Sequence, residues 1–508
     1  MNKKIFEKKL SNCENETLSY FFFQNALRVP DKKAFEWLDE EKGKVVGITY
    51  DELFRDITGL GTALYGLSYR KKTIALIGDR SYEWVLSFLT MVCSNAIVVP
   101  MDPKLETKEL IERIKFSDAQ VCIADDTLKL WSSGDLPGNL KMHKMSEIMD
   151  MTAGGLEEVL RGNEEWISDP ICNKQQVVMM FTSGTGGKNK AALIRQENFT
   201  LERYVWSGLE MENNTCLITL PLYHIAGIGD LRGTLLVGTT AYLSSGLRHL
   251  LKEYAYARPR IGFMVPAQAM LLYEVLSGKD KEEARALIGG NFSAIRATGA
   301  PLPDKIREMF KSYDIKVTSD YGMTETCGPV SVSMVKDGEI FSKEGSVGHI
   351  IDCLDVFVEN PDENGCGEIV ISGQCVFDGY YKDPEQTQAI LRDGKLYTGD
   401  IGRIDEDRFL FIVGRKKNVI ILSSGENVIP EELENMIYKV PEVKECLVFQ
   451  KDDAIVAKVY CGSEADAEKV ESDIKLLNKK LPSYKQIRSI LLQDTPLEKT
   501  SSGKIRRA

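Results

Sequence analysis

One short segment, Phe181–Lys190 (FTSGTGGKNK), gathers glycines, hydroxyls and lysines in a pattern suited to binding an anion. It follows the apolar run Val177–Met180, which has the length and composition of a buried strand. Backbone N–H groups of a glycine-rich loop can close around an anion, because glycine has no Cβ to block the approach. Lys188 and Lys190 add positive charge. The pattern predicts a phosphate-binding loop, although a surface turn rich in glycine, serine and threonine has a similar composition.

Four further segments carry groups with other chemistry. PLYHIAG places His224 after a strand-like run, where it is either a functional group or an ordinary structural histidine. TGAPLP (Thr298–Pro303) supplies small residues past which a flat ring or an acyl chain could lie. DYGMTE (Asp320–Glu325) joins an aromatic ring, a hydroxyl and a carboxylate, and Mg²⁺ prefers carboxylate and phosphate oxygens. YTGD ends in Asp400, an acid suited to a ribose diol, although an Asp after a glycine is commonly only a turn.

Alternating strand-like and helix-like segments must position these groups. The predicted strands are Thr73–Ile77, Ala96–Pro100, Val121–Ala124, Val177–Phe181, Cys216–Leu220, Ile261–Val265 and Ile295–Ala297, and two predicted helices are Tyr82–Val92 and Thr107–Phe116. Strands separated by helices predict βαβ units, with parallel sheets covered by helices on both faces. Ligands of such folds bind at the carboxyl ends of the strands, where the Phe181 loop begins.

The character of the chain changes after about Phe341. Short apolar runs such as Gly367–Ser372 and Phe409–Val413 predict a β-rich subdomain, and the charged segment Gly414–Asn418 separates it from a compact α/β remainder. We therefore predict an α/β protein with a large N-terminal domain, residues 1–416, made of parallel-sheet βαβ layers plus the small β-rich subdomain. Residues 417–508 form a separate small C-terminal α/β domain.

Composition narrows the class of protein. A chain of 508 residues is too long for one compact core, and its net charge of −11 argues against a nucleic-acid partner. Eleven scattered cysteines without a CxxC pair, and no apolar core after the first ten residues, predict reduced thiols in the cytoplasm. Polar residues interrupt the apolar segment Trp84–Met101, which predicts a buried helix and strand and no integral membrane segment.

The order of these segments resembles the adenylate-forming superfamily of acyl- and aryl-CoA synthetases, firefly luciferase and the adenylation domains of nonribosomal peptide synthetases. The matching segments are FTSGTGGKNK, PLYHIAG, TGAPLP, DYGMTE, GSVG (Gly345–Gly348), GYYKDPEQT (Gly379–Thr387), YTGD, GRKK, SGENVIPEELE (Ser424–Glu434) and SSGKIRR (Ser501–Arg507). The resemblance implies ATP-dependent activation of a carboxylic acid to acyl-AMP with release of pyrophosphate, followed by transfer to a thiol. The implied cofactors are ATP, Mg²⁺ and CoA, or the phosphopantetheine of a carrier protein.

The resemblance also implies roles for individual residues. The ATP-binding positions are Thr182, Ser183, Gly184, Thr185, Gly186, Gly187, Lys190, Gly299, Ala300, Pro301, Asp320, Tyr321, Gly322, Thr324, Asp400, Arg415 and Lys504. Within that set Asp320 and Tyr321 flank the adenine, Asp400 and Arg415 bind the ribose hydroxyls, and Thr324 contacts the α-phosphate. The catalytic set is Lys504, Thr324, Glu325 and His224, with Glu325 also the Mg²⁺ ligand. The substrate pocket is lined by His224, Gly227, Val265, Pro266, Thr298 and Met323. Lys417 is the interdomain hinge, and Gly425 and Glu426 belong to the segment that serves thiol transfer.

Lys504 also has a chemical reason for its role. A carboxylate that attacks an α-phosphate brings two anions together and expels a third, so a positioned cation is the main catalytic need. By resemblance, the mobile C-terminal domain first places Lys504 at the site and then replaces it with the Gly425 segment. A solvated basic tail is the plain alternative, because Arg506 and Arg507 follow closely.

Some positions depart from the family pattern, and they leave alternatives open. The family usually has Thr at Gly186, Pro at Asn189 and Gly at Ala191, and the Arg415-to-Gly425 spacing is slightly longer here. Losing one hydroxyl should loosen the triphosphate without abolishing its binding, since backbone amides dominate such loops.

The PLYHIAG form is closest to acyl- or aryl-CoA ligases, and no Asp matches the motif that holds an amino acid's ammonium, with only Asp230 further on. An amino acid is therefore disfavoured, while fatty and aromatic acids both remain open. Transfer to a carrier protein and a non-catalytic binding role are the alternatives. The intact Lys504, Glu325, Asp400 and Arg415 argue against the second.

Overall fold

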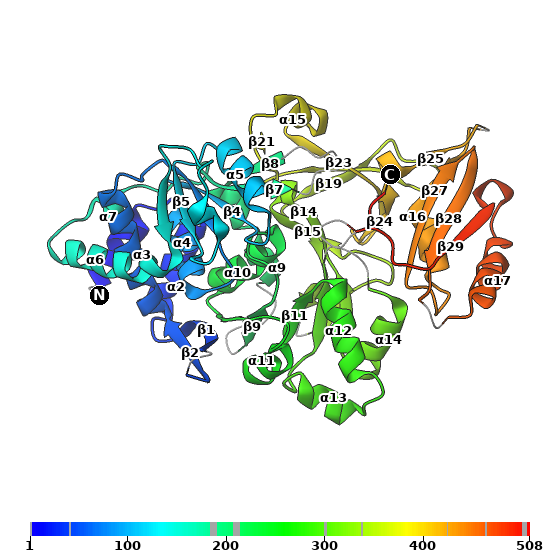
Figure 1. Cartoon of the computed structure of the whole chain (residues 1–508), viewed down its shortest axis with the longest axis horizontal. Helices are drawn as coiled ribbons and strands as arrows, with labels where there is room; N and C mark the ends of the chain where they lie inside the picture. The colour runs from blue at the N-terminus through cyan, green and yellow to red at the C-terminus, as the bar shows by residue number, and fades with distance from the viewer. Residues whose placement is uncertain are drawn as a thin grey trace.

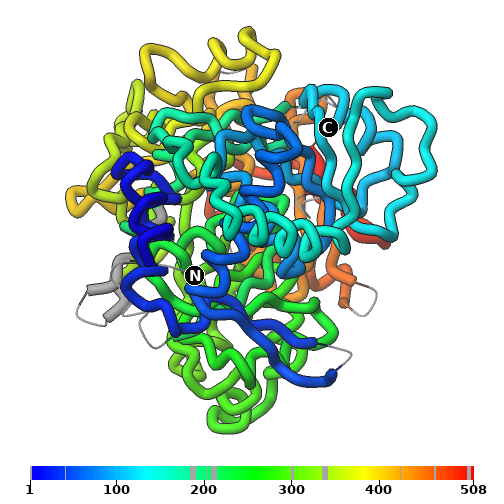
Figure 2. Tube along the Cα trace, turned by 90° about the vertical axis from the view of Figure 1, so that its left-hand side faces the viewer, coloured from blue at the N-terminus to red at the C-terminus, as the bar shows by residue number. Residues whose placement is uncertain are grey.

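The computed structural model describes residues 3–39, 42–182, 190–206, 214–298, 302–336, 339–423, 425–462, 465–499 and 505–507. The N-terminal helices lie at one end of the long axis and a small C-terminal α/β unit lies at the other (Figure 1). Seen along that axis, the N-terminal half stands in front and the C-terminal unit behind it (Figure 2). Within these ranges no helix combines the length and apolarity that crossing a membrane requires.

A seven-stranded sheet in the order β21-β8-β7-β4-β3-β5-β6 forms the first layer. Its strands are β3 (Thr73–Ile77), β4 (Ile97–Met101), β5 (Val121–Ala124), β6 (Lys141–Lys144), β7 (Gln176–Thr182), β8 (Lys190–Arg195) and β21 (Gly379–Tyr380). The helices around it are α3 (Tyr50–Gly66), α4 (Tyr82–Val92), α5 (Thr107–Phe116) and α6 (Ile148–Leu160). Alternate side chains of β3 face opposite sides: Ile74 and Leu76 join the core that includes α4, whereas Ala75 and Ile77 join the core that includes α5. Burial on both faces explains why these strands are apolar throughout.

Two further sheets continue the large unit. One has the order β2-β1-β10-β9 and the other is the parallel sheet β11-β12-β13. The bounds are β1 (Lys33–Asp39), β2 (Lys44–Thr49), β9 (Thr215–Ile218), β10 (Thr240–Leu243), β11 (Ile261–Met264), β12 (Ala294–Ala297) and β13 (Lys316–Ser319). The neighbouring helices are α10 (Ile225–Val237), α11 (Leu250–Ala257), α12 (Pro266–Leu276), α13 (Lys281–Leu287) and α14 (Asp304–Ser312). Parallel register aligns the carboxyl ends of β11, β12 and β13 at one edge, which faces the centre of the molecule (Figure 1).

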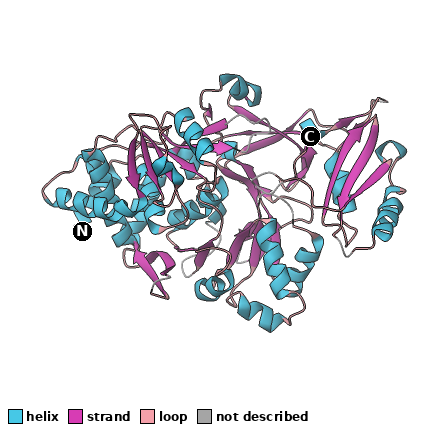
Figure 3. Cartoon of the chain, viewed as in Figure 1, coloured by secondary structure: helices cyan, strands magenta, loops and turns pink. Residues whose placement is uncertain are grey.

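The β-rich part follows, with the sheet β14-β15-β18 and the sheet β19-β20-β23-β22, to which β24 is added. The strands are β14 (Tyr321–Met323), β15 (Gly328–Val332), β18 (His349–Ile350), β19 (Asp355–Glu359), β20 (Gly367–Ser372), β22 (Leu391–Arg392), β23 (Lys395–Ile404) and β24 (Leu410–Arg415). Helix α15 (Pro384–Ile390) follows β21. This region is mostly strand in Figure 3, which agrees with the composition change after Phe341.

The C-terminal unit has its own sheet, β27-β28-β29, with helices α16 and α17 (Figure 3). Its elements are β25 (Ile420–Ile421), β26 (Asn427–Val428), α16 (Pro430–Ile437), β27 (Glu445–Lys451), β28 (Ala454–Tyr460), α17 (Ala467–Asn478) and β29 (Ser489–Gln493). A separate buried core runs from Ile420 to Ile487. The division of the chain at residues 416 and 417 stays a prediction.

The α/β fold class is confirmed, and the two helices predicted as Tyr82–Val92 and Thr107–Phe116 have these bounds. The strand predicted as Cys216–Leu220 ends earlier, at Ile218, because the chain turns at Leu220–Pro221 before α10. The segment after Val177–Phe181 returns as the antiparallel strand β8, so the glycine-rich loop joins two neighbouring strands.

Candidate active site

The ends of the glycine-rich loop face each other across a β-ladder. Thr182 ends β7 and is the direct ladder partner of Lys190, which begins β8. The Lys190 ammonium donates to Oε1 of Gln386 at 2.8 Å and lies 5.3 Å from the centre of the Tyr380 ring. The hairpin therefore carries its tip at the carboxyl end of β7. The predicted loop residues Ser183, Gly184, Thr185, Gly186 and Gly187 lie outside the described residues, as do Gly299, Ala300 and Pro301.

The carboxylate of Glu325 lies beside this hairpin. Glu325 belongs to a short 3₁₀ turn, Thr324–Thr326, and the Tyr380 hydroxyl donates to its carboxylate at 2.5 Å. The backbone N–H of Phe377 donates to the Glu325 carbonyl oxygen at 3.0 Å. Tyr380 pairs with Ala192 of β8, so strand pairing brings Glu325 to the strand that leaves the phosphate loop. Desolvation and the Glu325 charge raise the pKa of Tyr380, which keeps its hydroxyl a neutral donor.

The side chains of Asp400 and Arg415 form a pair fixed by strand register. The two residues are direct partners in the β23–β24 ladder, and Nε of Arg415 lies 2.5 Å from Oδ1 of Asp400. The Tyr321 hydroxyl donates to Oδ2 of Asp400 at 2.6 Å. The Asp400 side chain is 3% exposed and that of Arg415 45%, so the pair runs from the interior to the surface. Desolvation and the Asp400 charge raise the pKa of Tyr321, which remains a phenol.

Basic side chains gather where β24 leads into the C-terminal unit. An open cleft is lined by Thr398, Gly399, Arg415, Lys416 and Lys417. Desolvation lowers the pKa of Lys417, and the positive charges of Arg415, Lys190 and Arg507 lower it further. These four cations come from three distant parts of the sequence. Such an arrangement suits a polyanionic ligand, which would offset the repulsion among them.

The C-terminal tail is held on both sides of the predicted catalytic lysine. Lys504 lies outside the described residues, but Ile505 forms an antiparallel bridge with Lys499, and the Arg506 N–H donates to the Glu498 carbonyl at 2.8 Å. Arg507 pairs with Glu434 of α16 at 2.5 Å. The chain end lies between β24 and the C-terminal sheet (Figure 1).

The pKa of the Glu434 carboxyl is shifted strongly by its surroundings. Burial raises its pKa to about 7, while the guanidinium of Arg507 and the N–H of Val448 act in the opposite direction. The pair is therefore a buried link between the tail and α16, and its strength depends on the charge of Glu434.

The predicted thiol-transfer segment lies in the C-terminal unit. Gly425 occupies the turn between β25 and β26, where its φ of +95° favours glycine, and its N–H donates to the Leu422 carbonyl at 2.8 Å. The N–H of Leu422 donates to the Glu426 carbonyl at 3.0 Å. The turn is well defined, and its part in thiol transfer stays a prediction.

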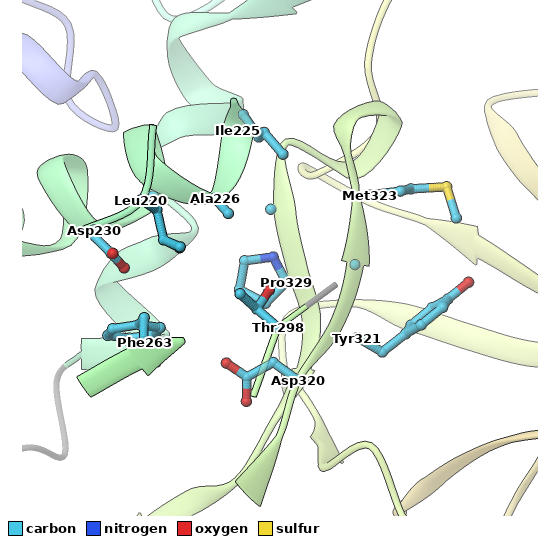
Figure 4. Close-up of a pocket in the computed structure, with 13 residues that line it drawn as sticks. Leu220, Ile225, Ala226, Asp230, Phe263, Thr298, Asp320, Tyr321, Met323 and Pro329 are labelled. Carbon is cyan, nitrogen blue, oxygen red and sulfur yellow. The ribbon is translucent and has the colours of Figure 1, made fainter. Parts of the chain in front are cut away.

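A cavity opens at the carboxyl edge of the parallel sheet β11-β12-β13. The space at this edge, open solvent at its mouth included, amounts to about 570 Å³. Its described lining residues are Leu220, Ile225, Ala226, Gly229, Asp230, Phe263, Thr298, Asp320, Tyr321, Gly322, Met323, Gly328 and Pro329 (Figure 4). Thr298 and Met323 of the predicted pocket set are among them.

The other four predicted pocket residues lie outside this lining for local reasons. His224 is an exposed residue that precedes α10, and desolvation lowers its pKa. Gly227 packs the helix against the backbone of Pro221, since a Cβ there would lie 2.2 Å from the Pro221 oxygen. Val265 and Pro266 begin α12. A catalytic role for His224 stays a prediction.

The neighbours Asp320 and Tyr321 point in different directions. Tyr321 reaches Asp400, whereas the Asp320 carboxylate points into the cavity beside Phe263 (Figure 4). That both residues flank the adenine stays a prediction. Successive side chains of extended backbone face opposite sides, which explains the difference.

Sequence reasoning assigned no role to several residues of the site. Tyr380 and Gln386 lie in the GYYKDPEQT segment, but their contacts depend on the pairing of β21 with β8. Asp230 follows Ala226 by one helical turn, so helical spacing could have placed both on the cavity side of α10. Phe263 carried no signal beyond its place in an apolar strand.

Comparisons with known proteins agree with this geometry. The family model "AMP-binding enzyme" matches residues 22–381, and the model "AMP-binding enzyme C-terminal domain" matches residues 417–508. A 2-succinylbenzoate–CoA ligase of Oceanobacillus iheyensis is 26% identical over 85% of this chain and 86% of its own length. A feruloyl-CoA synthase of Amycolatopsis sp. is 28% identical over 90% of this chain and 92% of its own length.

Two solved structures share the fold. The O-succinylbenzoate coenzyme A synthetase of Bacillus subtilis in complex with AMP has a TM-score of 0.77 at 23% identity and covers 96% of both chains. ATP-bound MatB of Rhodopseudomonas palustris has a TM-score of 0.80 at 22% identity, with 96% of this chain and 97% of that chain covered.

Proposed function

Because the chain belongs to the AMP-binding enzyme family, we propose that it is an AMP-forming acid–thiol ligase of the acyl-CoA synthetase type. Two observations carry the proposal. Arg415, paired with Asp400, lines an open basic cleft, and Tyr380 contacts both the Glu325 carboxylate and the Lys190 ammonium. The names of the acid–CoA ligases to which the chain is similar support the same reaction class.

The nucleotide binds across these groups. Asp400 accepts hydrogen bonds from the ribose hydroxyls, with Arg415 beside it, and the Tyr321 ring lies against the adenine. The backbone amides of the glycine-rich loop, together with Lys190, hold the β- and γ-phosphates, and Thr324 donates to the α-phosphate. Gly322 lets β14 pack closely against β15, since a Cβ there would lie 2.1 Å from the Gly328 oxygen.

Magnesium fits the residues present. Mg²⁺ in nucleotide sites is usually held by one or two carboxylates and the substrate phosphates. Glu325 supplies one such carboxylate, and the Tyr380 hydroxyl orients it. The bound ion would neutralise phosphate charge.

In the first step a carboxylate oxygen of the acid attacks the α-phosphorus. The bond to the oxygen that bridges the α- and β-phosphorus atoms breaks, pyrophosphate leaves, and a mixed anhydride, acyl-AMP, remains. Lys504 holds the incoming carboxylate and the α-phosphate together as a positive point charge. The described residues on either side of it are held, Arg507 by Glu434 and Ile505 by Lys499.

In the second step a thiol sulfur attacks the acyl carbon, loses its proton to solvent, and displaces AMP. We propose CoA as the thiol, with carrier-protein phosphopantetheine as the second candidate. In this proposal residues 417–508 rotate relative to residues 1–416 about Lys417. The rotation brings the Gly425–Glu426 turn to the site and forms the second arrangement. The eleven cysteines, none of them in a disulfide, support a reducing compartment such as the cytoplasm.

Acid-dependent exchange of labelled pyrophosphate into ATP tests the first step directly. We expect exchange that requires Mg²⁺ and one class of acid, and thioester formation once CoA is added. Faster transfer to a phosphopantetheinylated carrier protein than to CoA would favour the second candidate. A protein that binds ATP but shows no exchange with any acid would be a non-catalytic homologue.

A further inference from the structure

The cavity at the carboxyl edge of β11-β12-β13 has two carboxylates in its lining, which an apolar acyl chain could not hydrogen-bond. Among its described lining residues, the charged side chains are Asp230 of α10 and Asp320 after β13. Figure 4 shows their carboxylates pointing into the cavity from opposite sides, with Phe263 and Thr298 between them. The remaining lining is mostly apolar or glycine. The cavity is therefore apolar with two anionic acceptors.

Asp320 is a carboxylate poised to accept hydrogen bonds. Its Oδ1 is buried and has no hydrogen-bond partner, while the Ser333 N–H donates to the carboxylate. Burial raises the pKa of Asp320, and the positive charge of Arg296 opposes this shift and favours the anion. Buried carboxylate oxygens are normally hydrogen-bonded, so a ligand that brings a donor would remove a real cost.

The nearest buried guanidinium groups lie behind the cavity wall. Arg296 lies over the Phe263 ring at 5.4 Å and donates to the Ser333 carbonyl at 3.4 Å. Arg232 donates to the Cys327 carbonyl at 2.7 Å and lies over the Phe199 ring at 4.7 Å. Neither is among the described lining residues, so the charged side chains of the described lining are the two carboxylates.

An unsubstituted fatty acid is a poor match for this surface. Its methylene chain would cover the Asp320 carboxylate without giving its Oδ1 a hydrogen bond, and leaving a buried polar atom unpaired is costly. A substrate with a donor would supply that hydrogen bond, and a protonated amine would make it charge-assisted.

We propose that the acid activated here carries an amino group away from its reacting carboxylate, and that Asp320, with Asp230 opposite, selects it. This inference rests on the proposed function. It assigns Asp320 to the acid and leaves Tyr321 with the adenine.

The test compares acids of matched shape that differ in the donor. Two pairs suffice: 6-aminocaproate and heptanoate, and para-aminomethylbenzoate and para-ethylbenzoate. Pyrophosphate exchange is measured for the full chain with Mg-ATP, and calorimetry measures binding of the same acids. For at least one pair we expect kcat/KM to favour the amine by about 10- to 100-fold. A preference for the apolar partner in every pair would overturn the proposal.

The Asp320→Asn variant tests the residue itself, because it keeps the shape and removes the charge. The preference for the amine, measured as the ratio of the two kcat/KM values, should fall at least about tenfold. Asp355→Asn, an exposed acid of β19, is the control and should keep the wild-type preference. An unaltered preference in Asp320→Asn would overturn the assignment.

Failure of the inference and failure of the proposed function give different results. Amine-selective binding without exchange would contradict the ligase function and leave the selectivity intact. Exchange that favours apolar acids would support the ligase function and contradict the selectivity. Absence of both binding and exchange for every amine-bearing acid would overturn the selectivity.

Discussion

The proposed nucleotide wall, made of Tyr321, Asp400 and Arg415, and the C-terminal tail hold their functional groups by different means. In the wall, Asp400 and Arg415 face each other across a β-ladder, and Tyr321 donates to the same carboxylate. In the tail, the described residues are held by the Lys499–Ile505 bridge and by the pairing of Arg507 with Glu434. A sheet register is rigid, whereas a tail moves with the unit that carries it. The wall should therefore set affinity, and the tail should set the rate of the first step.

Lys504→Ala should give the largest effect, because it removes the point charge that the first step needs. We expect acyl-AMP formation to fall by about 100- to 1,000-fold, with thiol transfer from supplied acyl-AMP nearly unchanged. Rapid-quench assays of the two half-reactions measure this. Arg506→Ala removes the same charge from an exposed neighbour and is the matched control. Equal losses in both half-reactions would contradict the claim that the tail acts in the first step alone.

Lys417→Pro should affect the opposite half-reaction. Proline fixes φ and stiffens the segment between β24 and the C-terminal unit, so the second arrangement is hindered. We expect thioester formation to slow by about 100-fold, as for a misplaced reacting group, with pyrophosphate exchange retained. Lys417→Ala, which removes the charge but not the rotation, serves as the control. Unchanged thioester formation in the proline variant would refute the hinge.

Asp400→Asn probes the wall. The KM for ATP should rise by about 10- to 100-fold, because charged hydrogen bonds to the ribose and to Arg415 are weakened. Steady-state kinetics at saturating acid measure it. Asp407→Asn, at the exposed tip of the same hairpin, is the control. A loss confined to kcat would place Asp400 with the chemistry and not with affinity.

Glu434→Gln should give the smallest effect, visible in the pH dependence of stability. The folded-state pKa of Glu434 is raised to about 7, so the folded form binds a proton that the unfolded form releases near its ordinary pKa. The protonated state stabilises the C-terminal unit at low pH, and this contribution is lost as pH rises toward about 7.

Thermal midpoints of the full chain and of Glu434→Gln, measured between pH 5 and pH 8, provide the test. The stability of the wild type relative to the variant should decline by about 1–3 kcal/mol over this range, within what a shift of this size allows. A difference that does not change with pH would contradict the assignment.

The secondary-structure elements and the motifs of this chain can be predicted from its sequence, but the directions of its side chains are harder to predict. Helices such as Tyr82–Val92 can be predicted because the local periodicity of their apolar residues indicates a helix. The Asp400–Arg415 pair depends on a cross-strand register that two separate motifs do not encode individually. The same holds for Tyr380 and Glu325, which are far apart in the chain.

The acid cavity shows the limit most clearly. The sequence motif predicts Asp320 and Tyr321 together beside the adenine, yet these neighbours point in different directions. Tyr321 reaches Asp400, whereas Asp320 points into the cavity. Helical spacing could have placed Asp230 on the same side of α10 as Ala226, but only the tertiary fold brings Asp230 and Asp320 to one cavity.

Identification of the nucleotide product during turnover tests the central claim most directly. Phosphorus NMR of the full chain with Mg-ATP, the preferred acid and CoA should show AMP and pyrophosphate in equal amounts with the thioester. Accumulation of ADP and inorganic phosphate in place of these products would contradict the account.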